Sequence, residues 1–159
     1  MQRRWYATLG TVCALLAAGA ATGTVLVSSG TSAAAPTKEE YFARVAAICR
    51  IYGPKLNKVA PPSDIAIPGV VASSVGRALP LIEAQAAVVH ALRPPKELQA
   101  KIKRWIRLDN RAIRKLRESL RLAREPNISL LGVTYVEFLR ASIAAKKVGG
   151  TIGFPHPPC

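Results

Sequence analysis

The segment "KIKRWIRLDNRAIRKLRESLRLAR", residues 101–124, decides the fold class because its side chains separate into two stripes at the helical period. At 100° per residue, its apolar side chains and one just before it share one broad face. That face contains Leu98, Ile102, Trp105, Ile106, Ala112, Ile113, Leu116, Leu120 and Ala123. The pattern predicts a long amphipathic helix that packs on other helices.

The opposite stripe of this helix is basic. The segment holds ten Lys or Arg against two acids, Asp109 and Glu118. We name the seven aligned cations the basic ridge: Lys103, Arg107, Arg111, Arg114, Arg117, Arg121 and Arg124. It would extend about 30 Å by helix rise. Like charges four residues apart cost a few tenths of a kcal/mol in an isolated helix. The ridge is therefore interpreted either as a surface for polyanions or as the solvated face of a basic protein.

An earlier helix is predicted to begin at Thr37, which stands at capping-box spacing from Glu40. Its apolar positions share one face: Tyr41, Val45, Ile48, Cys49, Tyr52, Leu56 and Val59. We expect Gly53 and Pro54 to kink or break this helix, because proline removes a backbone donor and clashes with the preceding turn.

Two further helices are predicted, one on each side of the basic segment. Val70–Leu92 is apolar nearly all round and suits a buried helix with a kink at Pro80. Ser129–Val148 is expected to end at Gly149. Its expected core face is Leu130, Val133, Val136 or Glu137, Leu139 or Arg140, Ile143 and Ala144. Four helices with short connections predict an all-α, up-and-down four-helix bundle.

The amino end predicts export. Residues 1–35 carry Arg3 and Arg4 and then no charge until Lys38. Small residues at 32–35 suit a cleavable signal, whereas Tyr6–Val27 is long enough for an uncleaved anchor helix. Both alternatives place the remaining domain, residues 36–159, outside the cytoplasm, secreted or membrane-anchored.

The charge balance indicates the class of partner. The chain has a formal charge of +14, and the part beyond residue 35 keeps 21 bases and all nine acids. This excess favours an anionic lipid, a phosphate-bearing wall polymer or an acidic protein. Nucleic acid is a weaker alternative, because single-strand binding uses exposed aromatics and Trp105 lies on the apolar stripe. A further alternative is a structural or protein-interaction domain with incidental charge.

The cysteines predict one disulfide. Cys13 lies in the export segment, while Cys49 and Cys159 lie beyond it, where thiols oxidise. Closing a loop of about 110 residues would stabilise the fold by roughly 4–5 kcal/mol in the entropy model. Free or intermolecular thiols are the alternative. His90 and His156 have no metal-ligand spacing with Cys49, so no metal or cofactor is expected.

Three stretches carry a resemblance: "YFARVAAIC", "LRPPKELQAKIKRWIRLDNRAIRKL" and "GGTIGFPHPPC". Together they resemble a group of small actinobacterial exported or lipid-anchored helical proteins of unassigned function. The matching residues are Phe42, Ala46, Cys49, Leu92, Pro94, Pro95, Leu98, Trp105, Gly153 and Cys159. The resemblance implies the same single disulfide and helical fold, and no activity. It does not account for the basic ridge, because members of the group tend to be acidic or neutral in the third helix.

Asp109 falls within the apolar stripe, where an unpaired carboxylate would be costly. We expect a structural ion pair with a cation of another helix, such as Arg44 or Arg77. The alternative is a catalytic acid, which would need a second carboxylate or a nucleophile, and only Glu83 and Glu137 are available on other helices. The two histidines build no Ser-His-Asp arrangement, and we expect no enzymatic activity.

Overall fold

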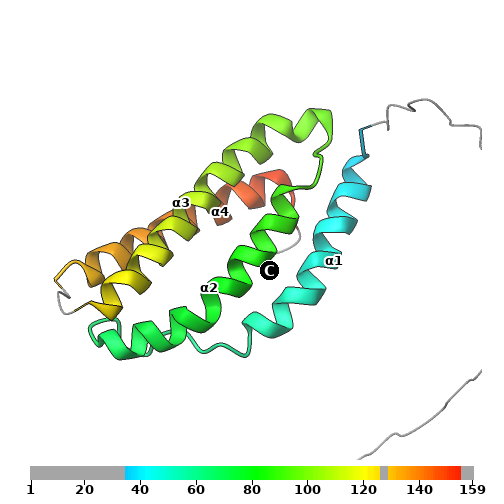
Figure 1. Cartoon of the computed structure of the whole chain (residues 1–159). Coiled ribbons are helices and arrows are strands. Elements are labelled where there is room, and N and C mark those ends of the chain that lie inside the picture. The colour runs from blue at the N-terminus through cyan, green and yellow to red at the C-terminus, as the bar shows by residue number, and fades with distance from the viewer. Residues whose placement is uncertain (1–34, 126–128, 155–159) are drawn as a thin grey trace, which may run out of the picture. The chain divides into compact units, whose positions relative to one another are not determined.

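The computed structural model describes residues 35–125 and 129–154, and these form four α-helices and one short 3₁₀ helix, with no strand. They are α1 (Lys38–Leu56), α2 (Pro68–His90), η1 (Lys96–Leu98), α3 (Gln99–Arg124) and α4 (Leu131–Ile152). Consecutive α-helices run in opposite directions (Figure 1). The predicted all-α, up-and-down bundle is therefore confirmed for the described part of the chain.

The predicted basic helix, α3, is the central helix of the bundle. α3 packs along α4 on one side and on α2 on the other, while α1 packs on α2 (Figure 1). Eight of the nine residues of the predicted apolar stripe are buried, and Ile106 is partly buried. An amphipathic stripe this wide can cover two neighbouring helices, which explains the central position of α3.

The core divides into two clusters along the bundle. The first joins most of α2, up to Ala86, with the second half of α3 and the start of α4, and it includes Leu116, Leu131 and Tyr135. The second joins α1, the end of α2, the first half of α3 and the end of α4. Phe154 anchors this second cluster, with its ring centroid 5.3 Å from Trp105 and 5.7 Å from Phe42. The carboxyl end of α4 is thereby fixed against α1.

The expected break in the first helix is wrong. α1 begins with the predicted capping box of Thr37 and Glu40, but it continues through Gly53 and Pro54 to Leu56. Pro54 is exposed and lies in the last turn, so its missing N–H removes one hydrogen bond close to the end of the helix. α2 also continues past Pro80, which faces solvent. The expected kinks at Pro54 and Pro80 stay predictions.

The expected end of the fourth helix is also wrong. α4 passes through Gly149 and stops at Ile152, and the left-handed cap is Gly153 with φ of 92°. The backbone N–H groups of Gly153 and Phe154 both donate to the Gly149 carbonyl. The extra turn buries Ile152 and Phe154 in the second cluster, and this burial favours the longer helix over termination at Gly149.

The predicted core face of α4 requires a larger correction. Leu130, Val133, Leu139 and Ile143, which were expected inside, are exposed. The face that packs inward instead carries Leu131, Thr134, Tyr135, Ala141, Ala145, Gly149 and Ile152. Its small residues let α4 approach α3 closely, while the bulkier Leu131 and Tyr135 fill the first cluster.

Several predictions fall on residues beyond those described. The export segment lies outside them except for Ala35, and so do Cys13, His156 and Cys159. Cys49 lies on α1 against the second cluster, and its pairing with Cys159 stays a prediction. Within residues 35–125 and 129–154, no helix is long and apolar enough to cross a membrane.

Candidate anion-binding site

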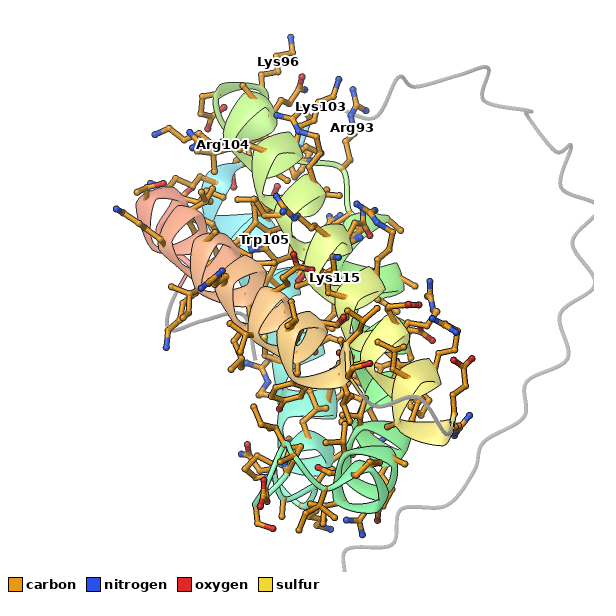
Figure 2. All side chains as sticks on the ribbon, turned by 90° about the vertical axis from the view of Figure 1, so that its left-hand side faces the viewer. Arg93, Lys96, Lys103, Arg104, Trp105 and Lys115 are labelled. Atoms are coloured by element: carbon orange, nitrogen blue, oxygen red, sulfur yellow. The ribbon has the colours of Figure 1, made fainter. Side chains whose placement is uncertain are left out.

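The basic ridge is a surface feature. All seven of its side chains are exposed on α3; Arg117 reaches Glu83 of α2, and Arg111 lines a groove that α3 forms with α4. Figure 2 shows Lys103 and Arg93 on the same side near the start of α3, with Lys96 at that end of the bundle. The fold therefore leaves the predicted row of cations on α3 exposed.

The carboxyl-terminal part of the ridge is partly neutralised. Arg117 donates to Glu83 of α2, with Nη2 and Oε1 2.5 Å apart. Arg121 lies between Glu118 and Glu125 and contacts both at 2.5 Å. The hydrogen bond from Arg121 lowers the pKa of the Glu118 carboxyl, and both glutamates raise the pKa of Arg121. These cations already have intramolecular partners.

The amino-terminal part of the ridge differs. We name Lys103, Arg107, Arg111 and Arg114 the open ridge, because no ion pair joins any of them to a carboxylate in the described part of the chain. Arg111 lies near enough to Glu137 to lower the pKa of that carboxyl, although the two form no ion pair. Four cations on successive turns, none of them in an ion pair among the described residues, give this part of α3 a positive potential.

A groove between α3 and α4 extends this positive surface. It has a volume of about 180 Å³ and is lined by Leu108, Arg111, Glu137, Arg140, Ala141 and Ala144. Glu137 pairs with Lys115, Nζ to Oε2 2.5 Å, and the pKa of its carboxyl is lowered first by Lys115 and then by Arg111 and Arg140. One carboxylate thus faces three cations. Sequence reasoning missed Lys115 and Arg140 because only the register of α3 against α4 brings them together.

Asp109 has a partner, but not the one expected. His90 at the end of α2 contacts it, Nε2 to Oδ2 2.9 Å, so the suggestion of Arg44 or Arg77 is wrong. The His90 ring also packs edge-on against Trp105, with centroids 5.5 Å apart. In the antiparallel α2–α3 pair, the last turn of α2 lies level with Asp109, so the imidazole is the polar group within reach.

The His90–Asp109 pair borders a small cavity. The cavity, about 40 Å³, is lined by Ile82, Gln85, Ala86, Val89, Trp105 and Asp109. This volume holds about one water molecule. None of the lining side chains carries a hydroxyl or a thiol, so the imidazole has no nucleophile to activate there. The pair satisfies two polar groups at the α2–α3 boundary and acts as a structural contact.

The described residues contain no group of three His, Cys, Asp or Glu side chains that could hold a metal ion. The architecture defines the class as a small four-helix bundle with a basic outer face. Comparison with protein-family models, with curated proteins and with solved structures gave no match. The resemblance to small actinobacterial exported proteins therefore stays a hypothesis.

Proposed function

We propose that this protein is a non-enzymatic, extracytoplasmic binding module that attaches to an anionic component of the cell envelope through the open ridge. The observation that carries the proposal is the unequal pairing of the cations on α3. Arg117 and Arg121 have carboxylate partners within the fold, whereas Lys103, Arg107 and Arg114 have none among the described residues. Arg124 at the carboxyl end of α3 also has no ion pair among the described residues, so the contrast lies in the uninterrupted run of unpaired cations from Lys103 to Arg114. Like charges in such a run repel one another, and folding alone gives no reason for it.

The spacing of the open ridge suits a linear polyanion. Lys103 to Arg114 spans about 16 Å by helix rise. Exposed guanidinium groups along that length could contact successive phosphates or carboxylates of an extended polymer, or the headgroups of a lipid surface. Binding would relieve the mutual repulsion of the four cations and release counterions, so affinity should fall steeply with salt.

The proposed module lies outside the cytoplasm and is closed by one disulfide. Export by residues 1–35 would present the ridge outside the cytoplasm, and a Cys49–Cys159 disulfide would close the fold. The packing of Phe154 on Phe42 supports this bridge, because it fixes the chain beside the helix that carries Cys49. Five further residues can reach about 17 Å, more than the roughly 10 Å of helix rise from Phe42 to Cys49.

The test uses the full chain in a neutral detergent and sodium polyphosphate as a soluble polyanion. The variant Arg107→Glu with Arg111→Glu and Arg114→Glu reverses three cations of the open ridge. Its control, Arg44→Glu with Arg50→Glu and Lys58→Glu, makes the same charge change at exposed positions on or just after α1. The two variants have equal net charge, so any difference in their polyphosphate binding is due to where the reversed charges lie.

We expect the control to bind nearly as well as the unchanged chain and the open-ridge variant to lose binding. For four phosphate contacts on a flexible strand, the logarithm of affinity should fall with the logarithm of salt concentration with a slope of about −3. Equal binding by the two variants, or a slope near zero, would show that the ridge charge is incidental.

A further inference from the structure

The outer face of α4 is apolar where a bundle helix is normally polar. Val133, Leu139 and Ile143 are exposed to 59%, 41% and 66%, and Val136 between them is partly exposed. We name these four residues the outer strip. They share the side of α4 opposite Leu131, Ala141 and Ala145, and they extend about 15 Å along the helix. No other described element covers them.

Cations lie among and beside the residues of the outer strip. At 100° per residue, Arg140 and Lys147 fall between Val136 and Val133 around the helix and Lys146 lies just beyond Leu139, and all three are exposed. The single acid of α4, Glu137, is held by Lys115. The surface of α4 therefore combines projecting aliphatic side chains with an excess of positive charge.

The groove between α3 and α4 connects this face to the open ridge. Arg140 from α4 and Arg111 from α3 line it together with Glu137, which is paired with Lys115. The apolar part of its lining is Leu108, Ala141 and Ala144. An anionic group bound between the two guanidinium groups would lie beside apolar surface. Phospholipid headgroups have this chemistry, with a phosphate next to an apolar body.

We infer that the outer strip docks onto an anionic phospholipid bilayer, with the aliphatic side chains in the headgroup and acyl boundary and Arg111 and Arg140 on lipid phosphates. Exposed aliphatic side chains together with nearby cations are the combination found in helices that lie in a membrane interface. The inference rests in part on the proposed function, because Arg111 belongs to the open ridge, and it narrows the partner to lipid.

Two other occupants fit the same face less well. A second copy of the chain would add its own Arg140, Lys146 and Lys147 to the same interface, and close like charges oppose such an interface. A hydrophilic polyanion would match the cations but would leave Val133 and Ile143 unused. A bilayer with anionic headgroups matches both the cations and the aliphatic side chains.

Tryptophan quenching can locate the docked face. The full chain carrying Trp5→Phe and Ile143→Trp is reconstituted with phosphatidylglycerol vesicles whose acyl chains are brominated. The control replaces Ile51 with tryptophan instead, because Ile51 is an isoleucine of similar exposure, 57%, on α1. Every sample retains the buried Trp105 and, apart from Trp5→Phe, the same amino-terminal residues, so a difference reports the position of the new indole.

We expect the Ile143→Trp indole to be quenched at least about twofold more than the Ile51→Trp indole, because the apolar face of an interfacial helix lies about 5–10 Å into the boundary. Phosphatidylcholine vesicles should reduce this difference. Equal quenching at both positions would overturn the inference. So would a shift to dimer on sedimentation without lipid-dependent quenching, which would favour a second copy as the occupant.

A second variant separates this inference from the proposed function. Val133→Ser with Leu139→Ser and Ile143→Ser removes the outer strip at exposed positions and leaves all four cations of the open ridge. We expect this variant to bind polyphosphate normally and to lose phosphatidylglycerol-dependent protection of α4 from hydrogen exchange. Retained protection would refute lipid docking even if the open ridge binds anions. Loss of polyphosphate binding by the open-ridge variant tests the proposed function alone.

Discussion

Replacing Phe154 with alanine should lower the free energy of unfolding by about 3–5 kcal/mol, the usual cost of removing a buried phenylalanine ring. Phe154 is 6% exposed, and its ring lies 5.3, 5.7 and 6.3 Å from the rings of Trp105, Phe42 and Tyr41. The substitution would leave a cavity where α1, α3 and the end of α4 meet. For a domain of this size, the melting temperature should fall by roughly 10–20 °C.

The assay is urea unfolding followed by circular dichroism, with Ile143→Ala as the matched control. Ile143 belongs to the face of α4 that sequence periodicity placed in the core, yet it is 66% exposed. Its truncation should change the free energy of unfolding by no more than about 0.5 kcal/mol. The packing of α4 described above would be refuted if Phe154→Ala lowered the free energy of unfolding by less than about 1 kcal/mol. It would also be refuted if Ile143→Ala lowered it by more than Phe154→Ala does.

Three further outcomes are expected. Asp109→Ala leaves the His90 imidazole without its partner and should lower the free energy of unfolding in urea by about 1–3 kcal/mol. Arg77→Ala, at an exposed position, should leave that free energy nearly unchanged. Gly153→Ala forces a side chain into a left-handed conformation and should cost about 1–2 kcal/mol, whereas Gly150→Ala, inside α4 with open space around its Cβ position, should raise the melting temperature. Glu137 has a lowered pKa in the folded state, so its contribution is present above the ordinary carboxyl pKa and is lost as pH falls through the lowered value. Stability measured from pH 7 down to about pH 3 should therefore decline less in Glu137→Gln, by a small amount because the pair is exposed.

The parts of the fold that the sequence predicted correctly depend on strong local patterns. The basic segment has apolar and charged stripes on opposite sides, so its period identifies both the helix and its buried face. The capping box at Thr37 likewise fixes the start of α1 within a few residues. In these elements the choice of buried face is decided within the helix itself.

α4 shows where this reasoning fails. Its apolar residues lie on several sides, with Leu131 and Tyr135 on one and Val133 and Ile143 on another. Periodicity cannot choose between two apolar faces. The bundle chooses the face whose small residues allow close contact with α3, and it leaves the other face as the outer strip.

The candidate site divides in the same way. The all-α bundle with one long basic helix, and the position of the ridge away from the core, follow from residue spacing along a single helix. The neutralised cations, the partner of Asp109 and the exposed face of α4 follow from how the helices pack on one another. Those outcomes depend on the register between helices, which brings Glu83 to Arg117, Glu137 to Lys115 and His90 to Asp109. Register is set by side-chain packing across the whole core, and no local sequence pattern encodes it.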